Sequence, residues 1–323
     1  MTTEPHMTIE PYETGMLAVG DGNHVYWETC GNPEGKPALV VHGGPGSGCT
    51  PGHRQIFAAD PHAYRAVLFD QRGCGRSRPH AADPATDLAH NTTAHLVADM
   101  ERLREHLGVD RWLLIGGSWG STLILAYAQA HPERVSEIVI NGVTTTRRAE
   151  TDWLYGGVSR FFPEEYERFR AGAGPGVAPG GVVAAYAALT GHPEAAVRER
   201  ATAEWCAWED AVLSLEPHGG PRPYSDRPGA AKLAMVRLCT HYFSQGAWLP
   251  EGALIAGAPR LAGIPGALFH GRLDLSSPLD TAYHLVKGWA DAELTVVGDA
   301  GHKGSAAMSR GVREALAGFA GRR

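Results

Sequence analysis

The sequence predicts an α/β protein in which a mostly parallel sheet is flanked by helices and interrupted by a helical insertion. Short apolar runs that end at glycine-rich turns alternate with helical segments, the order typical of a parallel sheet with helices on its faces. Residues 144–259 contain no clear buried strand, and helical stretches rich in Trp, Tyr and Phe predominate there. Two more apolar runs follow, so we expect the sheet to be completed after the insertion.

Each element is justified by its local pattern. An edge strand is expected first, at 25–29. Buried strands are expected where apolar runs reach a turn, at 38–42, 66–70, 112–115, 135–140, 266–270 and 293–297. Residues 93–107 carry apolar side chains at helical spacing before Gly108, 121–131 form a second helix stopped by Pro132, and 311–320 form a closing helix.

These elements divide the chain into three parts. Residues 1–143 are the first part of the core, 144–259 a helical cap, and 260–323 the second part of the core. Glycine- and proline-rich segments at 173–181 and 217–228 break the cap into shorter helices. The cap is therefore expected to lie over the sheet as an insertion between its strands.

Composition favours an ordinary globular enzyme. The 323 residues are 43% hydrophobic and 20% charged, with a formal charge of -6 and no basic block, which argues against a nucleic-acid partner. Residues 1–11 do not resemble a signal peptide, and no apolar stretch is long enough to span a membrane. The five cysteines are scattered and form no CxxC pair, so neither a disulfide framework nor a zinc site is expected. A cytoplasmic location is the expectation.

The motif Gly116-Gly-Ser-Trp-Gly120 carries the strongest chemical signal. It fits the G-x-S-x-G nucleophile elbow, and an apolar strand precedes it while a helix follows. Small neighbours let the sharp turn close, and the serine hydroxyl then stands at the positive end of the helix. Ser118 is therefore the predicted nucleophile.

A second motif, His42-Gly-Gly-Pro-Gly46, follows an early strand. A tetrahedral intermediate needs two N–H donors arranged around its oxyanion. In such sites one donor is the residue after the serine, here Trp119, and the other comes from a loop after an early strand. Gly43 is the natural second donor, because glycine allows the backbone to turn its N–H inward.

The acid and the histidine of a triad should follow the serine in that order. Asp274 lies just beyond the strand at 266–270, whereas the nearby Asp280 begins a helix and is interpreted as a capping residue. Of the 16 histidines, only His302 lies on a loop past the last strand. The prediction is that His302 acts as general base, Asp274 orients it, and Ser118 forms an acyl-enzyme, with no metal or cofactor.

At this point the chain resembles the proline iminopeptidases, serine exopeptidases of the α/β-hydrolase fold that remove N-terminal proline. The resemblance runs along most of the chain. Besides the two glycine motifs, it includes Asp70-Gln-Arg-Gly-Cys-Gly-Arg-Ser77, Asn91-Thr-Thr93, Ser159-Arg-Phe-Phe-Pro163, Trp208-Glu209, His241-Tyr-Phe243 and Gly271-Arg-Leu-Asp274. It implies a small peptide or amide substrate whose amino terminus is bound by cap carboxylates, Glu209 being one, with Tyr155 and Phe243 as pocket aromatics.

Two positions depart from the family pattern. Cys239 stands where the family has a second glutamate, so one anionic partner for an amine is missing. Loss of such a charged hydrogen bond costs about 1.5–3 kcal/mol, or ~10–100-fold in selectivity. A stacking aromatic is also absent near Thr144.

Three hypotheses remain. The first is an aminopeptidase of the proline-iminopeptidase type. The second is a related amidase, esterase or lactonase that no longer recognises a free amine, which the Cys239 departure motivates. The third is a non-hydrolytic binding protein, against which the triad and the oxyanion loop argue. Dehalogenases and epoxide hydrolases of this fold carry an aspartate at the elbow, where this chain has Ser118.

Overall fold

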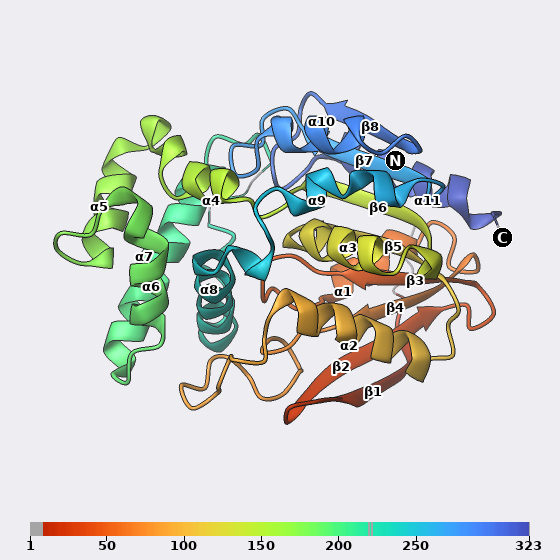
Figure 1. Ribbon diagram of the computed structural model, residues 1–323, viewed down its shortest axis with the longest axis horizontal. Helices are drawn as coiled ribbons and strands as arrows, with labels where there is room; N and C mark the ends of the chain where they lie inside the picture. The colour runs from red at the N-terminus through yellow and green to blue at the C-terminus, as the bar shows by residue number, and fades with distance from the viewer. Residues whose placement is uncertain (1–8, 219, 221, 323) are drawn as a thin grey trace, which may run out of the picture.

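The computed structural model describes residues 9–218, 220 and 222–322. Residues 1–8, most of the segment in which no signal peptide is expected, lie outside the described residues. Within the described ranges, eight strands form one sheet in the order β1-β2-β4-β3-β5-β6-β7-β8 (Figure 1). The strands are β1 Pro11–Gly20, β2 Asn23–Gly31, β3 Lys36–Val41, β4 Tyr64–Phe69, β5 Trp112–Ser118, β6 Val135–Val143, β7 Gly266–Gly271 and β8 Ala292–Val297.

Strands β3 to β8 run parallel, whereas β1 and β2 pair antiparallel and join the sheet through β4. The α/β fold class is thus confirmed, and each expected apolar run lies in a strand. The run at 293–297 is not a buried strand, however, because β8 is one edge of the sheet and only its Val297 is buried. The edge-strand assignment of 25–29 is wrong, because β1 pairs with the outer side of β2 and is itself the other edge of the sheet. The residues of β1 do not form the apolar pattern of a buried strand, because Tyr12 and Met16 are exposed and few of its residues are buried.

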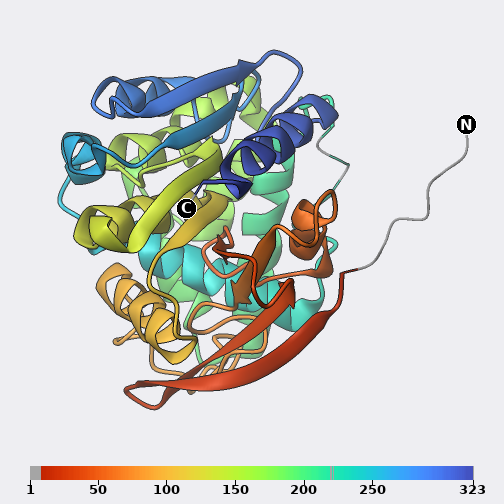
Figure 2. The same cartoon turned by 90° about the vertical axis from the view of Figure 1, so that its right-hand side faces the viewer.

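Helices cover both faces of the sheet, as Figure 2 shows nearly edge-on. Alternate residues of the central strands explain this: Leu39 and Val41 of β3 pack in one apolar cluster, and Ala38 and Val40 in the other. One face carries α2 (Thr93–His106), α3 (Trp119–Ala130), α9 (Ala253–Ala256) and α10 (Leu279–Lys287), and the other carries α1 (Pro51–Arg54) and α11 (Ala306–Ala320). Asp280 lies within the first turn of α10, whose N-cap is Pro278, so its capping assignment is wrong.

Five helices between β6 and β7 form a separate group to the left of the sheet in Figure 1. They are α4 (Arg148–Leu154), α5 (Pro163–Ala173), α6 (Val182–Thr190), α7 (Ala195–Leu213) and α8 (Gly229–Ser244). Aromatic side chains build their own apolar cluster, in which Phe169 stacks on Tyr186 and Trp208. The described part of this insertion contains no strand, and α8 contacts the core through Leu238 and Tyr242.

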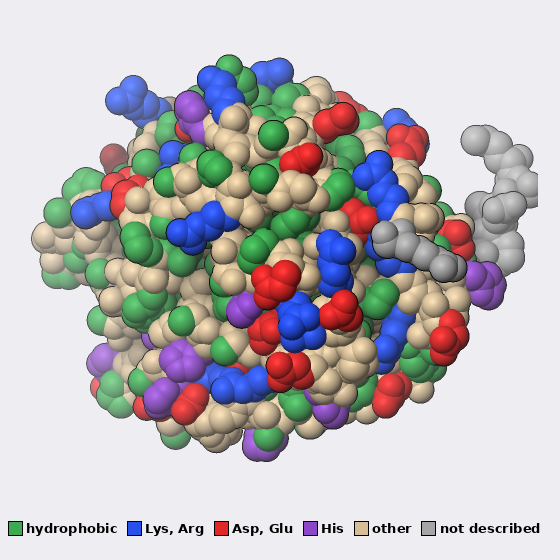
Figure 3. Space-filling model, turned by 45° about the vertical axis from the view of Figure 1, so that its right-hand side comes forward, with side chains coloured by type: hydrophobic (Ala, Val, Ile, Leu, Met, Phe, Trp, Pro, Cys, Tyr) green, Lys and Arg blue, Asp and Glu red, His purple; other side chains and the backbone are tan. Residues whose placement is uncertain are grey.

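Parallel order brings distant residues together at one edge of the sheet. Ser118 is the last residue of β5, and the carboxyl ends of β3, β7 and β8 lead into the loops that carry His42, Asp274 and His302. Loops at this edge are where open α/β sheets bind ligands. None of the described helices is both long and apolar enough to cross a membrane. On the face that Figure 3 shows, cationic and anionic side chains are interspersed.

Candidate active site

Ser118 ends β5 directly before α3 begins at Trp119. Its backbone has φ +54° and ψ -133°, a conformation that non-glycine residues adopt rarely and at a cost. The flanking glycines make the turn possible. A Cβ atom at Gly116 or Gly120 would collide with the carbonyl oxygen of Val41, and one at Gly117 with that of Asn141.

The structure brings Ser118, His302 and Asp274 into one hydrogen-bonded chain. His302 Nε2 lies 3.1 Å from Ser118 Oγ, and His302 Nδ1 lies 2.9 Å from Asp274 Oδ2. Asp274 is itself held by Ser277, whose backbone N–H donates to Oδ1 at 2.7 Å. These distances are those of a nucleophile, a base and the group that orients the base.

The charge of Asp274 raises the pKa of the His302 imidazole. Burial, the largest single effect, lowers the pKa of His302, but the charge of Asp274, its hydrogen bond and the charge of Glu216 together raise that pKa above its ordinary value. A raised pKa makes the imidazole a stronger proton acceptor. His302 is therefore suited to move the proton of the Ser118 hydroxyl.

Gly43 lies against the nucleophile. A Cβ atom at Gly43 would lie 3.3 Å from Ser118 Cβ and 3.1 Å from the carbonyl oxygen of Gly117. The loop after β3 therefore approaches the elbow more closely than most side chains allow, which is the position expected for an oxyanion donor.

Gln71 forms hydrogen bonds to both segments that are expected to form the oxyanion hole, the loop after β3 and the start of α3. Its side chain donates to the carbonyl oxygen of His42 at 2.8 Å and accepts from Trp119 Nε1 at 2.9 Å. Its backbone N–H donates to His42 Nε2 at 3.0 Å, so His42 is neutral, and burial lowers its pKa to about 4. No sequence motif indicated a role for Gln71, although a polar residue just after a parallel strand is a signal for a functional site.

The residues proposed for substrate binding converge on the same cavity. A narrow cavity of about 70 Å³ contains Ser118 and His302. It is also lined by the four residues singled out in the insertion, namely Tyr155, Glu209, Cys239 and Phe243, and by Trp119 and Thr144. The structure thus places every residue singled out for substrate binding beside the nucleophile.

Glu209 is a buried carboxylate within this cavity. The Tyr155 hydroxyl donates to its Oε1 at 2.7 Å. Burial raises the pKa of Glu209, and the hydrogen bond from Tyr155 only partly opposes that effect. Tyr155 also packs against Trp205, with ring centres 4.5 Å apart, so it serves the packing of the insertion as well as lining the cavity.

Cys239 does not replace the charge of a glutamate. Burial, followed by the nearby charge of Glu209, raises the pKa of its thiol well above the ordinary value. The thiol is therefore neutral, and its Sγ donates a long hydrogen bond to the carbonyl oxygen of Pro45 at 3.5 Å. Glu209 supplies the negative charge beside it.

Glu216, which no sequence pattern indicated, reaches the His302 loop from the connection that follows the insertion's helix α7. Its carboxylate accepts the backbone N–H of His302 at 2.7 Å and that of Lys303 at 3.0 Å. It is only 8% exposed, and a Cβ atom at Gly301 would collide with it. No local motif marks Glu216, because its role depends on how the insertion folds onto the last loop.

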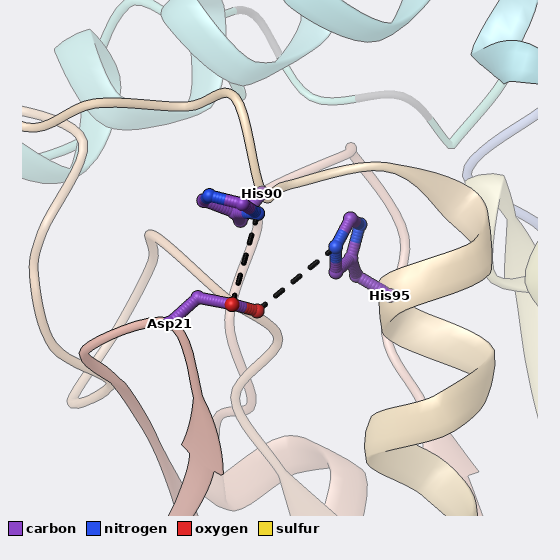
Figure 4. Close-up of side chains that lie close together, drawn as sticks. All are labelled: Asp21, His90 and His95. Atoms are coloured by element: carbon purple, nitrogen blue, oxygen red, sulfur yellow. Dashed lines mark ion pairs between the residues drawn. The ribbon is translucent and has the colours of Figure 1, made fainter.

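Among the described residues, one group of His and Asp side chains is close enough for a metal ion: Asp21, His90 and His95 (Figure 4). His90 Nδ1 and His95 Nε2 lie 3.8 and 4.0 Å from the Asp21 carboxylate. Arg72 Nη1 lies 3.4 Å from the same carboxylate, and the positive end of α2 is adjacent. Because these positive charges oppose a cation, we assign no metal to this group, which also does not line the cavity at Ser118.

Comparison with known proteins agrees with the fold and the motifs. The family described as alpha/beta hydrolase fold matches residues 36–305. A probable proline iminopeptidase of Streptomyces coelicolor is 51% identical over 91% of both chains, and a proline iminopeptidase of Xylella fastidiosa is 44% identical over 93% of both. The crystal structure of a proline iminopeptidase from Mycobacterium smegmatis superposes with a TM-score of 0.60 at 19% identity, covering 95% of this chain and 97% of that one, which supports the fold. The chain therefore belongs to the proline iminopeptidase family of the α/β-hydrolase fold and is a serine hydrolase.

Proposed function

We propose that this enzyme is an aminopeptidase that releases N-terminal proline, or a closely related residue, from small peptides or amides. The observation that carries the proposal is the buried carboxylate of Glu209 in the aromatic-walled cavity that contains Ser118. A buried charge is costly unless it is paired, and a substrate ammonium group provides the missing partner. The names of the relatives at 44–51% identity support the same activity.

The proposed chemistry begins with Ser118. His302 takes the proton from the hydroxyl as Oγ attacks the carbonyl carbon, and the oxyanion that forms is stabilised by the backbone N–H groups of Gly43 and Trp119. His302 then gives the proton to the leaving amine, which leaves an acyl-enzyme. Water attacks the ester with His302 again as base, and Ser118 is restored. Throughout, Asp274 stabilises the imidazolium and holds its tautomer.

Specificity is proposed to come from the insertion. Glu209 binds the free amine, and Tyr155 and Phe243 contact the side chain of the first residue. Their rings are 6.0 Å apart, and both line the cavity. Because the thiol of Cys239 is neutral, Glu209 provides the charge for amine recognition. A charged hydrogen bond of this kind contributes about 1.5–3 kcal/mol.

The test varies only the free amine. Hydrolysis of proline anilide is compared with that of its N-acetyl form, of alanine anilide and of an aryl ester, with Ser118→Ala as the inactive control. Strong preference for free proline anilide, reduced about 10–100-fold in Glu209→Gln while ester turnover persists, supports the proposal. Equal turnover of the free and acetylated anilides would refute amine recognition.

A second candidate is an amidase, esterase or lactonase without amine recognition. Cys239, which lines the cavity where the family carries a second glutamate, is the observation that favours it. Ester turnover with little activity on any free-amine anilide would support this candidate. The Cys239→Glu variant should then gain activity on proline anilide relative to the ester.

The surroundings of the enzyme are part of the proposal. All five cysteines are free thiols, which fits a reducing cytoplasm. We expect neither a nucleic acid nor a membrane surface as partner, because no basic segment is present in the sequence.

A further inference from the structure

A second cavity, of about 290 Å³, also reaches Ser118 and His302. Its walls include Gly43 and Ser47 of the loop after β3, which do not line the first cavity, and do not include Glu209 or Cys239. Two cationic side chains, Arg227 and Lys303, line only this second cavity. Ser118 therefore lies between a cavity that holds a carboxylate and a cavity that holds two cations.

The two cations share one wall. The Lys303 Nζ atom lies 5.3 Å from the ring centre of Tyr224, and the guanidinium carbon of Arg227 lies 5.4 Å from the same centre. Arg227 Nη1 and Nη2 both lie 3.5 Å from Ser47 Oγ. Burial, and next the charge of Arg227, lowers the pKa of Lys303. The two charges thus disfavour each other, and an anion between them would relieve that repulsion.

No described carboxylate pairs with Arg227 or Lys303 to relieve this repulsion. Within the described ranges, neither Arg227 nor Lys303 has a carboxylate oxygen within 4.0 Å. The three acidic groups whose charges act on Lys303 are committed elsewhere: Glu209, which lines the other cavity, accepts the Tyr155 hydroxyl. Asp210 accepts the backbone N–H groups of Tyr224 and Ser225, and Glu216 accepts those of the His302 loop.

The leaving group of the proposed reaction can place an anion beside these two cations. His302 must protonate the departing nitrogen, so the leaving part of the substrate lies near His302 and the adjacent Lys303. In a dipeptide the terminal carboxylate is separated from that nitrogen by a single α-carbon, within the ~3.5 Å that one residue spans. Arginine binds a carboxylate through two parallel N–H donors, and lysine adds a point charge.

We propose that Arg227 and Lys303 form a subsite for the C-terminal carboxylate of the leaving amino acid, so that the enzyme prefers dipeptides with a free carboxyl end. This inference rests on the proposed aminopeptidase function. It assigns the substrate two charged ends, the ammonium at Glu209 and the carboxylate at the second cavity. Longer peptides carry the carboxylate at least one residue farther from the scissile bond and lose this contact.

The test compares kcat/KM for prolylalanine with that for prolylalanine amide, which lacks only the negative charge. Wild-type enzyme should prefer the free acid about tenfold. The preference should fall toward one in Arg227→Gln and Lys303→Gln, and should largely remain in Arg227→Lys and Lys303→Arg. Because the ratio is taken within one enzyme, a general loss of activity or stability cancels. Arg222→Gln is the matched control, since Arg222 is an exposed cation on the same segment that lines neither cavity.

Salt provides a second measurement, because the preference for the acid should shrink as ionic strength rises. Turnover of proline anilide together with equal turnover of acid and amide would overturn the subsite alone. A preference that survives in the Arg227→Gln/Lys303→Gln double variant would also overturn it. Turnover of an aryl ester with no activity on proline anilide or either dipeptide would overturn the proposed function and the subsite together.

Discussion

Replacing Glu216 by glutamine tests whether the insertion helps to position the catalytic histidine. The carboxylate accepts two backbone N–H groups, from His302 and Lys303, at 2.7 and 3.0 Å. Glutamine keeps one acceptor oxygen and turns an NH₂ group toward the other N–H. One charge-assisted hydrogen bond is thereby lost, at a cost of about 1.5–3 kcal/mol. If that energy is fully expressed in the placement of His302, kcat/KM falls about 10–100-fold.

The charge of Glu216 has a separate consequence for pH dependence. It helps to raise the pKa of His302, after burial and the larger effect of Asp274 are taken into account. His302 must be neutral to act as a base, so activity rises as pH increases through this pKa. Removing the Glu216 charge lowers that pKa, and the acid limb of the profile should move to lower pH.

The assay is kcat/KM against pH on whichever of proline anilide or the aryl ester the wild-type enzyme turns over. Glu216→Gln should show both a lower plateau and a shifted acid limb, whereas Glu216→Asp keeps the charge and should shift the limb less. Glu199→Gln, an exposed change on α7, is the matched control. A lower plateau with an unmoved limb would reduce Glu216 to a structural contact, and a wild-type profile would refute the reasoning altogether.

Three further outcomes follow from the same geometry. Asp274→Asn should lower kcat about 10⁴-fold, because the amide favours the wrong tautomer of His302, and steady-state turnover measures the loss. Gly43→Ala should lower kcat about 10²-fold with little change in KM, because the added methyl group crowds the oxyanion site; a wild-type kcat would contradict this placement. Arg72→Met should lower the free energy of unfolding by about 3 kcal/mol in a urea titration, because it removes the partner at 2.6 Å from the fully buried Asp99 and leaves only the half-exposed Arg102 at 3.3 Å. A change below 1 kcal/mol would mean that Asp99 is protonated or hydrated instead.

The core strands were predictable because their signal is local. Strands β3 and β5 are apolar on both faces over most of their length, so each appears in the sequence as an apolar run, whereas in β6 the run is shortened to 138–140 by Ser136 and Glu137. Strand β1 has a different pattern, because its buried and partly buried residues lie on one side only. Met16, on the other side, is 46% exposed. Whether 25–29 forms an edge depends on β1 pairing with it, which the residues of 25–29 do not encode.

The candidate site divides in the same way. Ser118, Asp274 and His302 each follow a strand of the parallel sheet, and the chain order of this fold predicts them. Glu216 and Arg227 lie in the connection between α7 and α8, which has no repeating pattern. Their positions depend on long-range packing of the insertion over the last loop, and sequence spacing carries no information about that packing.

This division assigns separate tasks to the two parts of the chain. The sheet edge carries Ser118 and His302, the proposed nucleophile and base, whose geometry tolerates little change because Ser118 occupies a strained conformation enclosed by glycines. The insertion supplies Glu209 to one cavity and Arg227 to the other, and neither side chain constrains the elbow. On the proposed assignment, we expect a substitution such as Cys239 for a glutamate to change recognition of the ammonium end of a substrate while leaving the proton transfers intact. Among variants of the insertion residues that line the two cavities, activity toward an uncharged ester should consequently vary less than activity toward a peptide with both ends charged; Glu216, which contacts the His302 loop instead, is the exception.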